Sequence, residues 1–293
     1  MNVGRFTLER LRLPGVTTLP VWNRPLPDGR ELWERVGAPR VGEQRRLGVS
    51  EREIGRGMAA ALLPVLAGLQ EQLRPSVFFL TGGLCAVSGF REELVGTRAA
   101  CPVTIAREPA WAAAEAGLAW LAEQGAPGGA VVDVGQTSIK TLTSSARILH
   151  ERDLSVLPLR LIAPDGTSHG APTVPVAAFL AGGLRAALAS EAPKPRRVLL
   201  ALPCPLEDDL VPGPCTYGWQ GDRELLPAVF GLVAAAARAD GARPIPDAEA
   251  SVLVLNDAEL GAEAARRALA PEPGTRVLCL TLGFGPGGAL LEA

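Results

Sequence analysis

Short apolar runs alternate with segments of helical periodicity along most of the chain. Four runs of β-prone residues predict strands, at 77–81, 103–105, 197–202 and 251–255. Helices are expected before, between and after them, at 50–73, about 90–94, 110–124, 174–190, 224–239 and 258–269. Ser50 and Glu53 form a capping-box pattern at the start of the first of these helices. Alternating strands and helices predict an α/β fold with mixed or parallel sheets.

Two further segments, 130–142 and 276–292, have the pattern of hairpins, with apolar strands around a polar or glycine-rich turn. Glycine at such a tip lets backbone N–H groups approach phosphate oxygens, because there is no Cβ to hold the ligand away. Beside the first tip, Asp133 could hold a hydrated magnesium ion, and Thr137 or Lys140 could position phosphates. Taken alone, each tip is a weak indication, since most glycine turns are only turns.

Composition and charge narrow the classes of partner. At 293 residues and 47% apolar composition, the chain can bury a substantial core, as one large domain or two modest ones. The net charge of -2, with acids and bases spread along the chain, predicts that neither nucleic acid nor a membrane surface is a partner. The sequence shows no apolar leader or membrane-spanning run, so we expect a cytoplasmic protein.

Cysteine and histidine offer little chemistry. The five cysteines include no CxxC pair and no zinc-like grouping, so we interpret them as reduced and mostly buried thiols: Cys85, Cys101, Cys204, Cys215 and Cys279. The only histidines are His150 and His169, and the turn-rich surroundings of His169 favour a loop residue over a catalytic base.

Several motifs together resemble a known arrangement. The segment 133–140, Asp-Val-Gly-Gln-Thr-Ser-Ile-Lys, resembles the first phosphate motif of the sugar-kinase, Hsp70 and actin (ASKHA) superfamily, and 282–288 resembles its second. The segments 201–208 and 217–221 are similar to the Gly-Val-Pro-Gly-Pro-Val-Asp and tryptophan-glycine stretches of the ROK branch (repressors, open reading frames and kinases). The segment 255–263, Leu-Asn-Asp-Ala-Glu-Leu-Gly-Ala-Glu, resembles its Glu-Asn-Asp-Ala-Asn box.

The resemblance implies a two-lobed, actin-like (ribonuclease H-like) fold that binds ATP and Mg²⁺ and phosphorylates a hydroxyl of a sugar or small polyol. It implies that Asp257 is the general base and that Asn256 contacts the substrate. It also implies nucleotide contacts from both tips, with Asp133 as the magnesium ligand: Asp133, Gly135, Gln136, Thr137, Lys140, Gly283, Gly285 and Gly287. The alternative interpretation of Asn256 or Asp257 is that either merely caps the helix that follows.

The order of the motifs predicts a circular permutation. The segment 78–84, with Gly82 and Gly83, resembles the adenosine motif that normally comes later in the chain, and 108–117 resembles the terminal helix of such kinases. A joint at 125–129 would connect an old end to an old start, giving a nucleotide-side lobe at 1–125 and a phosphate-loop lobe at 126–293. The alternative is an unrelated N-terminal domain beside a truncated half. Residues 1–50 resemble no motif of this superfamily.

The sequence departs from the ROK pattern at several positions. The Glu-(Ile/Leu)-Gly-His pattern and the cysteine-rich zinc motif, which grip the sugar in that family, have no counterpart. Gln136 replaces a usual glycine, and Pro286 removes one potential phosphate-binding N–H. These departures keep a second function open, an actin-like switch or assembly ATPase that phosphorylates no metabolite, and a homodimer is possible. A ROK-type repressor is disfavoured by the charge, and a radical-dehydratase activator by the cysteine spacing.

Overall fold

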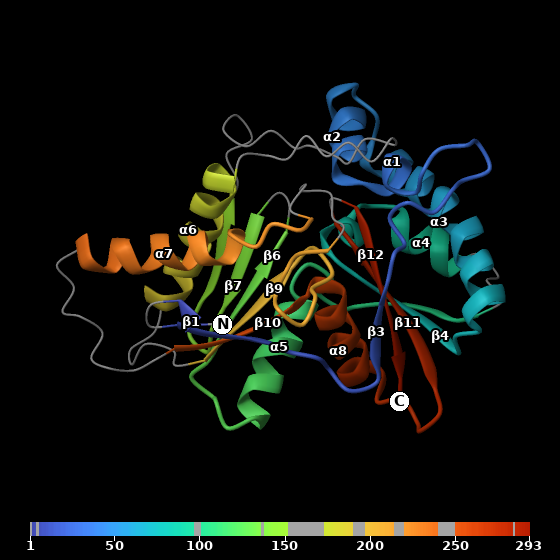
Figure 1. The fold of residues 1–293 in the computed structure, drawn as a ribbon. Helices are drawn as coiled ribbons and strands as arrows, with labels where there is room; N and C mark the ends of the chain where they lie inside the picture. Colours follow the sequence, from blue (N-terminus) through green and yellow to red (C-terminus); the bar gives the residue numbers. More distant parts are fainter. Residues whose placement is uncertain are drawn as a thin grey trace. The chain divides into compact units, whose positions relative to one another are not determined.

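The described part of the chain has an α/β fold, as predicted (Figure 1). A computed structural model describes residues 2–3, 6–96, 101–135, 138–151, 173–189, 197–213, 220–239, 250–283 and 285–293. The chain forms two compact units. Unit 1 comprises Met1–Arg12 and Gly117–Asp257, and unit 2 comprises Leu13–Ala116 and Ala258–Ala293.

Unit 1 is built on a seven-stranded sheet with the order β1-β2-β10-β9-β6-β7-β8. Its strands are β1 (Asn2–Val3), β2 (Phe6–Arg10), β6 (Ala130–Val134), β7 (Ser138–Leu142), β8 (Arg147–Glu151), β9 (Arg197–Leu202) and β10 (Ala250–Asn256). The strands β6, β7 and β8 form an antiparallel meander, whereas β9, β10 and β2 continue the sheet parallel to β6. The predicted hairpin at 130–142 and the strands at 197–202 and 251–255 are therefore confirmed.

Two helices cover one face of this sheet, α6 (Thr173–Ala189) and α7 (Leu225–Ala239), as Figure 1 shows. Alternate residues of the central strands, among them Val132, Leu200 and Val254, form one core cluster with apolar residues of both helices. The middle strands are buried on both faces, which explains their nearly continuous apolar runs. Near the edge of the sheet, His150 on β8 stacks on Phe179 of α6, with ring centroids 5.5 Å apart.

Unit 2 is built on a five-stranded sheet with the order β3-β12-β11-β4-β5. Its strands are β3 (Val16–Leu19), β4 (Val77–Thr81), β5 (Val103–Ile105), β11 (Arg276–Leu282) and β12 (Pro286–Glu292). The strands β11, β12 and β3 are antiparallel neighbours, and β4 and β5 run parallel to β11. The predicted hairpin at 276–292 is confirmed, and the sheet joins it to the strands at 77–81 and 103–105.

The helices of unit 2 include α1 (Trp33–Val36), α2 (Ala38–Arg46), α3 (Glu51–Leu73), the short 3₁₀ helix η1 (Gly83–Ala86) and α4 (Phe90–Gly96). The capping box at the start of α3 is confirmed, because Glu53 N donates to Ser50 Oγ and Ser50 N donates to the Glu53 carboxylate. Helix α5 (Ala112–Glu123) crosses the boundary between the units, and α8 (Asp257–Leu269) begins on it. Alanines of α8 pack on Phe79 and Cys279 of the sheet.

Five of the seven described strands of unit 1, all except β1 and β2, repeat the topology of unit 2. In unit 1 a meander, β6-β7-β8, leads through α6 to β9, parallel to the first strand, and through α7 to β10. In unit 2 the corresponding path is β11-β12-β3, then α1 to α3, β4, η1 and α4, and β5. The meander of unit 2 takes two strands from the end of the sequence and its third from the beginning. Where they meet, Glu292 N donates to Gly15 O at 2.8 Å.

The compact units differ from the lobes expected at 1–125 and 126–293. Contacts divide the chain at three points, and residues 258–293 group with 13–116. The physical reason is sheet pairing, since β11 lies in parallel register with β4 from Val277 opposite Val77 to Thr281 opposite Thr81. At the other end of the chain, β2 pairs with β10 and thereby belongs to unit 1.

Candidate functional site

In unit 1, the parallel strands β6, β9, β10 and β2 end at the same edge of the sheet. Asp133 lies opposite Ala201 on β9, and Ala201 lies opposite Leu255 on β10. With strands about 4.8 Å apart, the Cα atoms of Asp133 and Leu255 are about 10 Å apart. Asn256 and Asp257 follow Leu255 directly. The sheet therefore brings the predicted magnesium ligand and the predicted base to one edge, where α/β proteins commonly bind ligands.

Asp133 and Lys140 form a partly buried ion pair at this edge. They are directly opposite on β6 and β7, and Lys140 Nζ lies 3.2 Å from Asp133 Oδ2. The side chain of Lys140 is only 17% exposed and that of Asp133 only 10%. Removing one partner would leave the other charge buried and unpaired, which is costly. The pair thus fixes an anionic and a cationic group in one corner.

The first hairpin tip is tight. Gly135 N donates to Ser138 O at 2.9 Å, so this amide is used within the hairpin. A phosphate contact through the Gly135 N–H, which the resemblance implies, would have to share or replace that bond. Gln136 and Thr137, the other predicted contacts of this tip, lie outside the described residues.

Asn256 and Asp257 lie where β10 passes into α8. Asn256 is buried at 5% exposure, and its Nδ2 donates to Leu202 O at 3.3 Å, which joins the ends of β9 and β10. Asp257 is the first residue of α8 and is partly exposed. A carboxylate in the first turn of a helix is also favoured by the helix dipole, so its position fits both a base and a purely stabilising role.

In unit 2, the ends of β4 and β11 meet at a glycine corner formed by Gly82, Gly83 and Gly283. Gly82 has φ +99, and a Cβ added there would lie 2.3 Å from Leu282 O. Its amide donates to Pro109 O at 2.7 Å. A Cβ added at Gly83 or Gly283 would have no atom within 4 Å, and Gly283 O accepts from Ala38 N. The sequence-predicted adenosine and second phosphate motifs are thus brought side by side.

The second hairpin is shorter at its tip than the sequence suggested. Strand β12 begins at Pro286, opposite Leu282, and Gly287 lies opposite Thr281 within the ladder. Gly287 is therefore a strand residue, and the connection between the strands consists of residues 283–285. Gly285 lies in that connection. At position 286 the missing N–H of proline falls at the first residue of a strand, a position that tolerates it.

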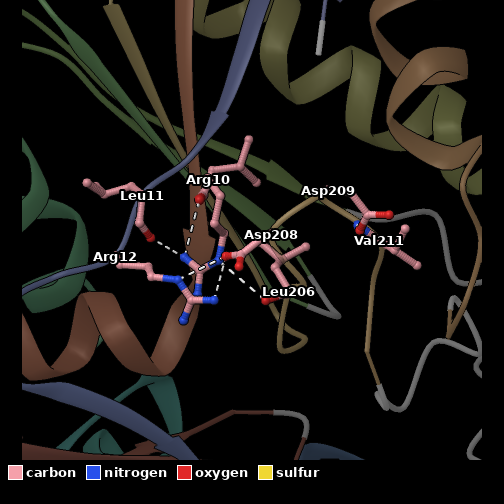
Figure 2. A network of polar contacts seen from close by, with 8 residues as sticks. Arg10, Leu11, Arg12, Leu206, Asp208, Asp209 and Val211 are labelled. Carbon is pink, nitrogen blue, oxygen red and sulfur yellow. Dashed lines mark hydrogen bonds and ion pairs between the residues drawn. The ribbon is translucent and has the colours of Figure 1, made fainter.

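A group of residues at the same edge of unit 1 was missed by sequence reasoning. Arg10 and Arg12 lie at and just beyond the end of β2, and both reach a short hairpin formed by residues 205–213 (Figure 2). Gly213 N donates to Pro205 O, and Leu206 and Pro212 form a bridge at its base. The alternation of Phe6 and Leu8 with polar residues was the available signal for β2.

The cysteines fit the structural role expected of them. Cys85, Cys101, Cys204 and Cys279 are buried, and burial raises the pKa of Cys85, Cys101 and Cys279. Cys215 and His169 lie outside the described residues.

Within the described ranges, no three histidine, cysteine or acidic side chains gather in a way that could hold a metal ion. No helix in the same ranges is long and apolar enough to cross a membrane.

No protein-family model matches the chain, and no curated protein matches it.

Proposed function

We propose that this protein is an ATP-dependent phosphotransferase that phosphorylates a hydroxyl of a sugar or other small polyol, with Asp257 as general base. The observation that carries the proposal is the common edge of unit 1, where Asp133 on β6 lies two strands from the end of β10 and its partner Lys140 lies on the next strand, β7. Phosphoryl transfer needs mainly positioning and charge neutralisation, and this edge offers an acid-base pair for the phosphates and a separate carboxylate for the hydroxyl.

Each side chain has a defined role in this proposal. Lys140 balances phosphate charge once its bond to Asp133 is shared with the nucleotide. Asp257 accepts the proton of the substrate hydroxyl as that oxygen attacks the transferred phosphoryl group. Asn256 is buried and tied to the Leu202 carbonyl, so it fixes the end of β10 and thereby the start of α8, which carries Asp257.

The donor set fits a magnesium ion bound with the nucleotide. Magnesium in such sites is held by one or two carboxylates and by phosphate oxygens, with water completing the shell. Asp133 supplies one carboxylate at a corner that is largely shielded from solvent. When bound, the ion would neutralise charge on the transferring phosphoryl group.

The repeated topology supports the actin-like, permuted form of the fold. Two units that share this five-stranded topology, a meander followed by two parallel strands, are what the resemblance implies for the two lobes. The proximity of Glu292 and Gly15 means that a short turn could join β12 to β3, restoring an uninterrupted meander. The unrelated-domain alternative gives no reason for β3, β4 and β5 to complete the sheet that β11 and β12 begin.

The proposal is tested by measuring ATP consumption with a panel of sugars and polyols. We expect at least one compound to stimulate turnover, and we expect Asp257→Asn to lower kcat by about 10²- to 10⁴-fold, the usual contribution of a general base. Glu272→Gln is the matched control, since it removes one carboxylate from the exposed turn before β11.

The outcomes separate the two candidate functions. Turnover that no compound stimulates, together with ATP-linked self-association in light scattering, would support the switch or assembly ATPase instead. If a compound still stimulates ATP consumption in Asp257→Asn to the wild-type extent, the kinase activity is supported but Asp257 is not its general base. If calorimetry detects no binding of ATP, both the phosphotransferase and the switch or assembly ATPase are refuted.

A further inference from the structure

The end of β2 places two arginines next to the proposed base. Arg10 is opposite Val254 on β10, two residues before Asn256, and β2 is the next strand beyond β10 in the sheet. The phosphate-side pair Asp133 and Lys140 lies on the other side of β10 in the strand order. A substrate whose hydroxyl is at Asp257 would therefore extend, on the side away from the phosphates, toward β2.

Several contacts of these arginines are of kinds that can be exchanged. Arg10 donates to Leu11 O, and among its other contacts are Nε to Leu206 O at 3.4 Å and Nη1 to Val254 O at 3.5 Å. Bonds of that length are weak. Arg12 donates from Nε and Nη2 to the same oxygen of Asp208, at 3.0 and 2.5 Å. Figure 2 shows both guanidinium groups directed at the hairpin.

Asp208 already places a carboxylate on Arg12. The pair with Arg12 is highly exposed, 64% for Arg12 and 82% for Asp208, so it contributes little to stability. Arginine binds carboxylates and phosphates through planar, charge-assisted hydrogen bonds that suit either oxyanion. A substrate oxyanion at the same place would replace the Asp208 carboxylate at low cost.

We propose that Arg10 and Arg12 bind an oxyanion at the end of the substrate remote from the reacting hydroxyl, so that the substrate is a hydroxyl compound carrying a carboxylate or a phosphate. The inference rests on the proposed function and names the substrate class for the same site. The residues that grip a neutral sugar in the family that this sequence resembles have no counterpart here, and β2 supplies different chemistry at that edge.

The test compares neutral compounds with their anionic counterparts. ATP consumption is measured with glycerol, glycerate and glycerol 3-phosphate, and with glucose, gluconate and glucose 6-phosphate. We expect kcat/KM to be at least about tenfold higher for the anionic members, the factor that one charge-assisted contact supplies. The carboxylate and phosphate members then show which oxyanion is preferred.

Variants separate binding from a merely structural ion pair. Arg12→Gln and Arg10→Gln are expected to raise KM for the anionic compound about tenfold each while kcat changes little. Asp208→Asn removes the competing carboxylate and is expected to lower KM by up to about fivefold. A structural pair would predict unchanged or weaker binding in Asp208→Asn. Arg45→Gln is the control, since Arg45 also forms an exposed ion pair, with Glu51 in unit 2.

A binding measurement makes the outcomes distinguishable. Calorimetry with glycerate and glycerol 3-phosphate in the absence of ATP reports the oxyanion site without turnover. Stimulation by neutral compounds alone would overturn this inference and leave the kinase standing. Arginine-dependent oxyanion binding without any stimulated ATP consumption would keep the oxyanion site and overturn the kinase. Anion binding that is equal in wild type and both arginine variants would overturn the assignment to Arg10 and Arg12.

Discussion

Gly82→Ala should destabilise unit 2 more than any change at the neighbouring Gly83. Gly82 has φ 99 and ψ 158, a region that only glycine adopts easily, and an added Cβ would lie 2.3, 2.6 and 2.7 Å from the O, N and C atoms of Leu282. Backbone strain of this kind costs about 1 to 3 kcal/mol, and overpacking against atoms that cannot rotate away adds about 1 to 3 kcal/mol. Together these approach half of a typical domain stability.

Urea denaturation followed by circular dichroism measures this effect, and Gly83→Ala is its matched control. No atom lies within 4 Å of a Cβ added at Gly83, so the control should change stability by less than about 1 kcal/mol. The two units can unfold separately, so midpoints are compared only if the m-values agree. Equal midpoints for the two variants would refute the reasoning, because the close approach of β4 to β11 at Gly82 would then be relaxed at no cost.

Three further predictions concern local features of unit 2. Gly55→Ala should lower the urea midpoint, because its Cβ would meet a backbone carbonyl at 2.1 Å, whereas Gly57→Ala, with open space, should raise stability by up to about 1 kcal/mol. Ser50→Ala should cost about 1 kcal/mol at neutral pH. The Ser50 hydroxyl also donates to the Glu53 carboxylate and holds the pKa of Glu53 below its usual value. That part of the stabilisation is present above the usual pKa and is lost as the pH falls through the lowered pKa, whereas the bond from Glu53 N to Ser50 Oγ does not titrate. Thermal melts from pH 7 to pH 3 should therefore show the difference between variant and wild type narrowing. Burial raises the pKa of Cys85, so iodoacetamide should label it only after denaturation, and rapid labelling of the native protein would contradict its buried position.

Local patterns predicted the elements well because the forces that form them act over a few residues. The capping box of Ser50 and Glu53 and the hairpin at 130–142 depend on contacts between residues close in sequence, and both are present. Three strand pairings, β2 with β10, β4 with β11 and β3 with β12, instead join segments about 200 or more residues apart. Nothing in the alternation at 6–10 indicates that this segment pairs with 250–254. For the same reason, the sequence predicted a single division of the chain, between residues 125 and 126, whereas the contacts divide it at three points.

The candidate site shows the same limit. Asp133 was predicted as the magnesium ligand and Lys140 as a phosphate contact from one motif, and the hairpin places Lys140 Nζ 3.2 Å from Asp133 Oδ2. Arg10 and Arg12 had no motif to mark them, because their position comes from the placement of β2 beside β10. The engaged amides of Gly135 and Gly82 were not predictable either, since glycine tips indicate close approach but not which group approaches.

The shared topology makes the chemical difference between the units explicit. Asp133 precedes Val-Gly at the end of β6, and Thr281 precedes Leu-Gly at the corresponding end of β11. Their cross-strand partners are Lys140 and Gly287. One backbone arrangement thus carries a charged pair in unit 1 and two small residues in unit 2. Charged side chains at one corner suit the neutralisation of phosphates, and small residues at the other suit close approach of the backbone to a ligand. Under the proposed function, the charged corner of unit 1 would carry the chemistry of phosphoryl transfer.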